Sequence, residues 1–176
     1  GWLIEGGMHP HPFGPGAEAA NTPAMVLPEF GASPQERAAV VGFPVPAGSS
    51  DFSDPEARLQ DLERMGIDIQ VLFPTTLYAR MTADPGFEAA LYRSYNRYMA
   101  QRCKFNPKRL KWAGLLPLRE TTQAIEALDE MQSLGAAAAV IFGTAGDRLL
   151  SDAVFTPVWN EFAKRKIPLC VHMGMS

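Results

Sequence analysis

The sequence predicts an α/β protein built on a parallel sheet, because two kinds of segment alternate along the chain. From residue 54 onward, short apolar runs alternate with longer segments in which apolar residues recur every three or four positions. This alternation is typical of βαβ units, in which parallel strands are joined by right-handed helical crossovers. Four strands are predicted, at residues 67–73, 110–116, 136–142 and 167–172.

The length of the chain limits how these units can close. A complete (β/α)₈ barrel needs eight strands and typically about 250 residues, whereas this sequence has 176 residues. The four strands therefore match half of a barrel, with strands in sequential order. The alternative is a complete doubly wound domain, in which the strand order reverses at a switch point.

Helix start and stop signals separate the strands. Asp54-Pro55 and Asp84-Pro85 each place a capping carboxylate before a proline at the first helical position. The first helix has an apolar stripe of Leu59, Leu62 and Met65 and ends at Gly66. The second ends at Asn106-Pro107, and five of its residues recur at helical spacing: Phe87, Leu91, Tyr95, Tyr98 and Arg102. A third helix is expected from a cap at Thr121 or Thr122 to Gly135, and a fourth from near Pro157 to the basic residues 164–166.

The chain divides into two predicted regions. Residues 1–53 are rich in Gly and Pro and have little hydrophobic periodicity, so they predict an irregular N-terminal excursion. Within it, residues 2–6 are consistent with a short strand and residues 32–41 with a short helix. Residues 54–176 hold the βα units of the partial barrel.

Composition and charge narrow the classes of partner. A formal net charge of −3 gives no electrostatic reason to expect nucleic acid. The longest apolar run, 136–142, suits a buried strand rather than a membrane span, so no membrane partner is predicted. Cys103 and Cys170 lie far apart in the sequence, which suggests reduced thiols and a cytoplasmic location.

The strand that ends on His172 is the strongest candidate for a functional site. Alternation places Ile167, Leu169 and Val171 on one face, expected to pack on helices, and Cys170 and His172 on the other. Chemistry in α/β proteins is found at the carboxyl ends of parallel strands. His172 is therefore either a site residue or a hydrogen-bonded histidine at a strand-to-loop corner. Cys170 is expected to be a small buried residue rather than a nucleophile.

Three further segments have competing interpretations. His9-Pro10-His11 has the spacing of a metal-binding pair, but the neighbouring glycines and prolines favour an exposed loop. The loop 143–147 lacks the spacing of a phosphate-binding motif and is better interpreted as a βα loop at the active end of a barrel. Thr75 and Thr76 occupy the equivalent position after the first clear strand and would either contact a substrate or start a turn.

Several segments together resemble a known family. The segments 54–59 and 66–75, Tyr95-Asn96, residues 109–118 and 124–135, residues 150–159 and the final 167–172 resemble the amidohydrolase-related family 2. This family includes aminocarboxymuconate-semialdehyde decarboxylase and the resorcylate-type decarboxylases. The resemblance covers roughly residues 51–174 and implies a (β/α)₈ barrel, of which this chain holds about strands 2 to 5.

The resemblance also implies a metal-dependent enzyme. Family members hold a divalent ion, often zinc, through a histidine pair on the first strand, a histidine on the fifth and an aspartate on the eighth. His172 matches the fifth-strand ligand; the first-strand pair and the eighth-strand aspartate have no clear counterpart, and His9 and His11 are alternative ligands. The implied activity is hydrolysis or non-oxidative decarboxylation of a small carboxylated or carbonyl substrate, with no catalytic residue assigned.

Two consequences follow for the chain as a unit. The sequence is expected to be part of a longer enzyme; the alternative is a truncated or degenerate member that acts as a non-catalytic binding or assembly module. Half of a barrel has two unpaired sheet edges, which favour association. These edges are therefore expected to pair with another chain, as in a homo-oligomer, or with missing segments of the longer enzyme.

Overall fold

The computed structural model describes residues 2–4, 7–9, 49, 52–74, 77 and 82–172. Residue contacts divide the chain into two compact units, Gly1–Ile69 and Gln70–Ser176, and each is described by itself. The division at residue 53 that the sequence suggests stays a prediction.

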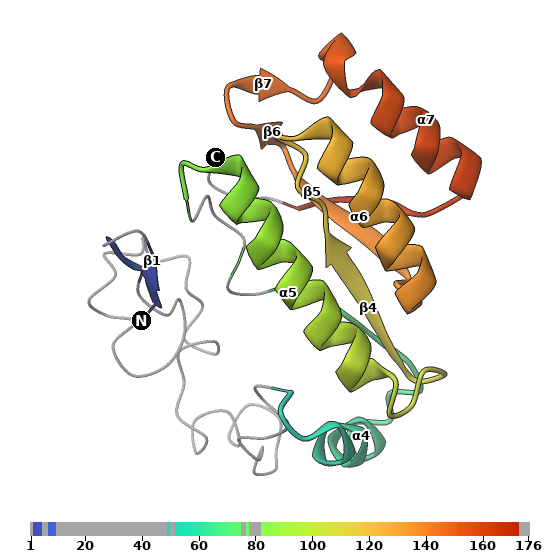
Figure 1. Ribbon diagram of the computed structural model, residues 1–176. Helices are drawn as coiled ribbons and strands as arrows, with labels where there is room; N and C mark the ends of the chain where they lie inside the picture. The colour runs from blue at the N-terminus through green and yellow to red at the C-terminus, as the bar shows by residue number, and fades with distance from the viewer. Residues whose placement is uncertain are drawn as a thin grey trace. The chain divides into compact units, whose positions relative to one another are not determined.

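Among its described residues, the first unit contains a short antiparallel hairpin and helix α4 (Pro55–Arg64) (Figure 1). Strands β1 (Trp2–Ile4) and β2 (Gly7–His9) pair antiparallel, with Trp2 opposite His9. The strand predicted within residues 2–6 is confirmed over Trp2–Ile4. The prediction that His9 lies in an exposed loop is wrong, because the backbone of Gly7–His9 pairs with β1 despite the glycines around it. His11 and the helix expected at residues 32–41 lie outside the described residues.

Helix α4 (Pro55–Arg64) begins where the sequence predicts. The Asp54 carboxylate accepts hydrogen bonds from the amides of Glu56 and Ala57, at 3.0 and 3.1 Å, and Pro55 occupies the first turn. The helix ends before Gly66, whose φ of 68° lies in the left-handed region. Of the predicted apolar stripe only Leu62 is fully buried, and Met65 is 41% exposed.

The second unit is built on a four-stranded parallel sheet in the order β3-β4-β5-β8. Its strands are β3 (Gln70–Leu72), β4 (Leu110–Leu115), β5 (Ala138–Phe142) and β8 (Leu169–His172). All pairings are parallel and the order is sequential, which confirms the partial-barrel prediction and excludes an order reversal within this sheet. The first strand is shorter than the predicted 67–73, since only three of its residues pair with β4.

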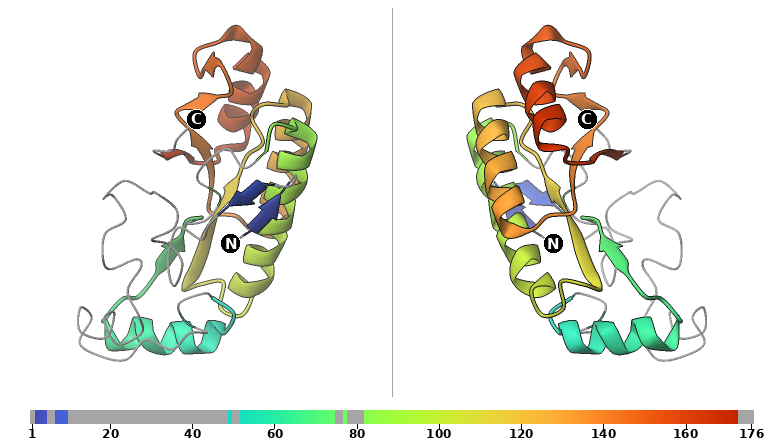
Figure 2. Two further views of the ribbon diagram at one scale, coloured as in Figure 1. Left: turned by 90° about the vertical axis from the view of Figure 1, so that its left-hand side faces the viewer. Right: turned by 90° about the vertical axis from the view of Figure 1, so that its right-hand side faces the viewer.

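Three helices connect these strands (Figures 1 and 2). They are α5 (Pro85–Cys103), α6 (Thr121–Leu134) and α7 (Thr156–Arg165), the last preceded by the 3₁₀ turn η2 (Ala153–Phe155). A small antiparallel hairpin, β6 (Thr144–Ala145) and β7 (Arg148–Leu149), lies between β5 and η2. The predicted caps at Asp84 and Gly135 are confirmed, whereas α6 begins after Glu120, one residue before the predicted threonine cap, and without a side-chain cap bond.

The core forms around β4 and β5. Ala113 and Leu115 of β4 pack with Ala138 and Val140 of β5 and with Tyr92 of α5. The alternate position on β4, Gly114, faces Met131 of α6 so closely that a Cβ atom there would lie 2.9 Å from Met131 Cγ. Both alternating sets of β4 side chains are therefore buried, as a strand inside a parallel sheet requires.

Two buried faces differ from those predicted. The buried side of α5 follows Ala89, Tyr92, Asn96, Met99 and Cys103, whereas the predicted Phe87 and Tyr98 are 38% and 36% exposed. The polar Asn96 belongs to the buried side because the backbone of β4 uses its amide, a pairing that hydrophobic spacing does not reveal.

The second difference concerns strand β8. The face that carries Leu169 and Val171 was expected to pack on helices, but it is exposed. Leu169 and Val171 are 39% and 59% exposed. Strand β8 is the last strand of the described sheet, with β5 as its single partner there, and no described helix covers these two side chains.

Asn96 completes the end of β4 where β3 has stopped. The last pair between β3 and β4 joins Leu72 and Trp112. Beyond it, the Leu115 amide donates to Asn96 Oδ1 at 2.8 Å, and Asn96 Nδ2 donates to the Leu115 carbonyl at 2.9 Å. A side chain of α5 thus makes the two bonds that a neighbouring strand would make, and the end of β4 stays satisfied although it is buried.

We expect Asn96→Leu to destabilise the protein by about 2 to 4 kcal/mol, because it leaves a buried amide and a buried carbonyl unpaired. Urea unfolding followed by circular dichroism measures this loss. Asn160→Leu is the matched control, since Asn160 is an exposed residue of α7. Equal stabilities of the two variants would contradict the strand-completing role of Asn96.

Candidate active-site rim

The carboxyl ends of β4, β5 and β8 form one rim of the sheet. Parallel register places Val140 beside both Leu115 and Cys170, and Phe142 beside His172. The residues that follow these strands therefore emerge at the same edge. This is the edge at which parallel α/β proteins place their sites.

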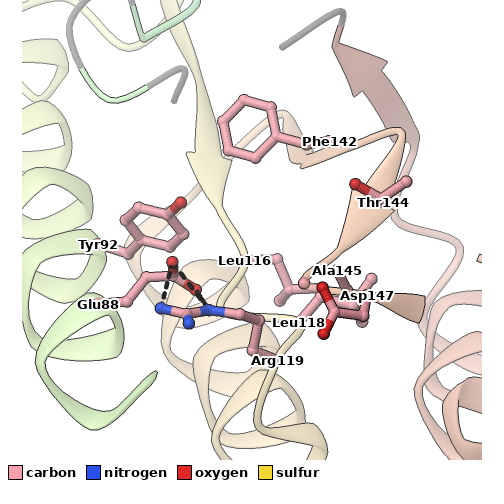
Figure 3. A pocket seen from close by; sticks show the side chains of 10 residues that line it. Glu88, Tyr92, Leu116, Leu118, Arg119, Phe142, Thr144, Ala145 and Asp147 are labelled. Atoms are coloured by element: carbon pink, nitrogen blue, oxygen red, sulfur yellow. Dashed lines mark hydrogen bonds and ion pairs between the residues drawn. The ribbon is translucent and has the colours of Figure 1, made fainter. Parts of the chain in front are cut away.

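A cavity of about 160 Å³ lies at the ends of β4 and β5. Figure 3 shows Glu88 and Tyr92 of α5 on one side and Phe142 and Thr144 on the other. The remaining walls come from the segment after β4 and from the β6–β7 hairpin. The full lining is Glu88, Tyr92, Leu116, Leu118, Arg119, Phe142, Thr144, Ala145, Gly146 and Asp147.

A buried ion pair forms one wall of this cavity. Arg119 Nε donates to Glu88 Oε1 at 3.0 Å, and Arg119 Nη2 donates to Glu88 Oε2 at 2.9 Å. The two side chains are only 12% and 8% exposed. The same guanidinium donates to the carbonyls of Ala83 and Thr82, at 3.1 and 2.9 Å. Arg119 thereby ties the segment after β4 to the start of α5, and this double contact fixes the width of the cavity.

Tyr92 supplies a hydroxyl group to the cavity. Burial is the main cause that raises the pKa of Tyr92 above its usual value, and the nearby Glu88 carboxylate raises it further while Arg119 opposes the shift. The phenol is therefore neutral at every physiological pH. On the opposite wall, the buried Thr144 Oγ1 has no hydrogen-bond partner within the described part of the chain.

His172 lies at the tip of β8, one strand away from this cavity. It is partly exposed, and its ring meets Phe142 edge-on with 6.5 Å between the ring centroids. Because β5 lies between β4 and β8, Phe142 separates His172 from the end of β4. The predicted position at the end of a parallel strand is confirmed, while the role of His172 as a metal ligand stays a prediction.

The described residues do not complete a metal site. No group of three or more His, Cys, Asp or Glu side chains converges within the ranges that the structure describes. His172 is one candidate ligand at the rim; Cys170 is a free, partly buried cysteine that packs against the core. His9 belongs to the other unit, and His11 lies outside the described residues. A metal at His172 therefore requires ligands beyond those described here.

Of the remaining predicted site segments, the structure describes the loop 143–147. The loop 143–147 lies at the rim as expected, and part of it forms β6. Thr75 and Thr76 lie outside the described residues. Glu88 and Arg119 were not predicted as site residues. In the sequence, a carboxylate on a helix and an arginine 31 positions later, after a strand, are typical of ordinary solvated charges.

These features are those of a partial (β/α)₈ barrel with a polar cavity at the carboxyl rim of its parallel strands. No family model matches the chain. A curated relative, the 2-amino-3-carboxymuconate-6-semialdehyde decarboxylase of Dictyostelium discoideum, is 30% identical over 124 residues. That match covers 70% of this chain and 34% of the relative.

Two of the solved structures with similar folds are named as decarboxylases. The 2,6-dihydroxybenzoate decarboxylase from Rhizobium has a TM-score of 0.62 and 20% identity, over 93% of this chain and 47% of that one. A dihydroxybenzoic acid decarboxylase from Polaromonas sp. JS666, with bound manganese and the inhibitor 2-nitroresorcinol, has a TM-score of 0.61 and 20% identity, over 80% of this chain and 46% of that one. At 20% sequence identity, this structural similarity supports the fold assignment alone.

The comparisons confirm the resemblance predicted from the sequence: this chain is similar to part of the amidohydrolase-related decarboxylases. It spans about a third of the length of the curated relative and just under half of these two solved structures. In the helices that the structure describes, no segment is long and apolar enough to cross a membrane.

We expect Glu88→Gln to destabilise the protein by about 3 kcal/mol, because it leaves the buried Arg119 charge without a counter-charge. Chemical unfolding of the variant measures this cost. Glu126→Gln on α6 is the control, since Glu126 is exposed and outside the cavity. A loss below about 0.5 kcal/mol would show that the Glu88–Arg119 pair does not fix the cavity wall.

Proposed function

We propose that this chain is part of a metal-dependent decarboxylase or hydrolase that acts on a small carboxylated or carbonyl substrate. One observation carries the proposal: the chain is 30% identical to a decarboxylase over 124 residues. The position of His172 at the carboxyl tip of a parallel strand supports it. Decarboxylation is favoured over hydrolysis, since the curated relative and the solved structures described above are named as decarboxylases.

His172 is proposed as one ligand of the divalent ion. A neutral imidazole binds such ions through a ring nitrogen. A bound divalent ion polarises a carbonyl or carboxylate oxygen and lowers the pKa of a coordinated water molecule. Zinc is the proposed ion because imidazole is among its preferred ligands. Manganese is the alternative, since the Polaromonas structure contains it.

His172→Ala tests this assignment. Loss of an outer-shell partner alone lowers metal affinity by about 10- to 100-fold, so we expect loss of the ligand itself to lower zinc or manganese affinity by at least about 100-fold. The measurement is metal content by mass spectrometry after dialysis against each ion, together with decarboxylase activity.

Cys170→Ser on the same strand is the control and should retain the metal. Full metal content in His172→Ala would overturn the assignment. Parallel His9→Ala and His11→Ala variants decide whether either histidine is a further ligand.

The proposed assembly is a homo-oligomer in which an edge of the described sheet contacts a second copy, where no further strand of the longer enzyme covers that edge. Val71 near one edge and Val171 at the other are 45% and 59% exposed, and unpaired strands with apolar side chains favour association. A cytoplasmic location is proposed as well, supported by two free cysteines.

Sedimentation tests the assembly. We expect Val171→Lys to shift the protein toward the monomer, whereas Leu149→Lys, at an exposed position of β7, should leave the oligomer unchanged. A monomeric wild-type protein at micromolar concentration would contradict the proposal.

A further inference from the structure

We infer that the turn between α5 and β4 binds the surface of an anionic phospholipid membrane. The binding surface, which we call the basic tip, consists of Arg102, Lys104, Phe105, Lys108 and Lys111. It lies at the edge of the sheet where β4 begins, opposite the rim described above (Figure 1). The inference is independent of the proposed metal and substrate, because no rim residue takes part in it.

The positive charges of the chain are concentrated near this turn. Between Glu88 and Glu120 the sequence has eight Lys or Arg residues and no Asp or Glu. These eight are half of the 16 Lys and Arg residues in the chain. The formal net charge of −3 therefore conceals a strongly positive segment and gives no guide to what this segment binds.

Three lysines of the basic tip have no counter-charge. Lys104, Lys108 and Lys111 form no ion pair in the part of the chain that the structure describes. Lys104 and Lys108 are exposed, and Lys111 is half-buried. Arg109 is not counted, because it already has a partner. Other arginines of the same segment are paired with carboxylates: Arg93 and Arg97 with Glu130, and Arg119 with Glu88.

The backbone of the turn gathers these charges in a small space. The Phe105 amide donates to the Arg102 carbonyl, and the Asn106 amide donates to the Cys103 carbonyl, both at 3.2 Å. The chain then returns along β4, so that Lys111 lies near the end of α5. There it opposes the rise that burial causes in the pKa of the Cys103 thiol.

The end of helix α5 explains only part of this charge. Cations are favoured in the last turn of a helix because the carbonyl end of the helix is negative. This effect accounts for Arg102 and Lys104, which lie at that end. It does not account for Lys108 or for Lys111, which lie beyond the helix.

An exposed aromatic side chain lies among these charges. Phe105 is 57% exposed, and Lys104 precedes it directly. Aromatic rings are favoured at the level of the lipid headgroups, and lysines are attracted to anionic headgroups. Long lysine side chains can also lie along apolar surface while the ammonium group stays in water. An aromatic ring flanked by lysines therefore suits a bilayer surface better than lysines alone.

The shape of the basic tip favours a membrane over an acidic peptide. Its residues form a helix end and a turn, and the cavity described above does not include them. Bound peptides usually lie in a groove or along the edge of a sheet, whereas a turn can contact a broad bilayer surface directly. Nucleic acid is disfavoured, because the rest of the chain carries an excess of negative charge.

Attachment through the basic tip leaves the proposed active site open to water. The rim at the carboxyl ends of β4, β5 and β8 faces away from the bilayer when the opposite edge contacts it. The prediction of no membrane partner was based on the lack of a spanning segment, which binding at the surface does not need.

Vesicle sedimentation tests the inference with the whole chain. The probes are vesicles of phosphatidylcholine alone and vesicles of phosphatidylcholine mixed with phosphatidylserine. One lysine near an anionic bilayer strengthens binding about fivefold, so we expect a partition coefficient at least about tenfold higher for the mixed vesicles. Lys104→Gln combined with Lys108→Gln should lower it by at least about fivefold. Added salt should lower it as well, because it screens the charges.

Two further variants separate the basic tip from charge in general. Arg93→Gln combined with Arg148→Gln removes the same net charge from α5 and β7, outside the basic tip, and should leave partitioning unchanged. Phe105→Ser should weaken binding to the mixed vesicles about fivefold, because part of the ring is buried among the headgroups. Circular dichroism of every variant distinguishes a loss of fold from a loss of binding.

Three results would overturn the inference: no vesicle binding, equal binding to neutral and mixed vesicles, or wild-type binding by the double lysine variant. Tighter binding of poly-glutamate or single-stranded DNA than of mixed vesicles would overturn it too, since the partner would then be an acidic protein or a nucleic acid. None of these results bears on His172 as a metal ligand, and failure of the metal assignment would leave the basic tip unaffected.

Discussion

The parallel pairing of β4, β5 and β8 is the constraint on which the rest of the second unit depends. It aligns Leu115 with Val140 and Phe142 with His172, so that the carboxyl ends of three strands reach one rim. A chain that paired any of these strands antiparallel would send the corresponding loop to the opposite edge. Residues that are far apart in the sequence lie together at this rim, because each crossover brings the chain back to the edge of the sheet where the previous strand began.

Helix α5 links this sheet to the cavity through polar groups rather than apolar ones. Asn96 makes the two backbone bonds that Leu115 lacks where β3 has stopped, and Glu88 holds Arg119 at the segment that follows β4. The two contacts lie about two helical turns apart on α5, so one rigid helix fixes both the end of the strand and the wall of the cavity. A buried pair of this kind is weak support for stability, and its value here is geometric.

The sequence predicted the strand order, most helix boundaries and the position of His172, because proline, glycine and aspartate at element ends act locally. It did not predict which side of α5 is buried, since that side is decided by the backbone of β4 through Asn96. It missed Glu88 and Arg119 for a related reason: they are 31 positions apart, and their pairing exists only in the folded chain. The expectation for Leu169 and Val171 failed because it assumed a covering helix, which the described structure does not place there.

We propose that the rim formed by β4, β5 and β8 holds a divalent metal ion with His172 as one of its ligands. Crystals of the protein grown with zinc or manganese and measured at the absorption edge of each metal test it most directly. The account predicts an anomalous difference peak about 2 Å from a ring nitrogen of His172, the usual metal–imidazole distance. A well-ordered His172 ring with no peak beside it, or a metal bound only at the opposite edge of the sheet, would contradict it.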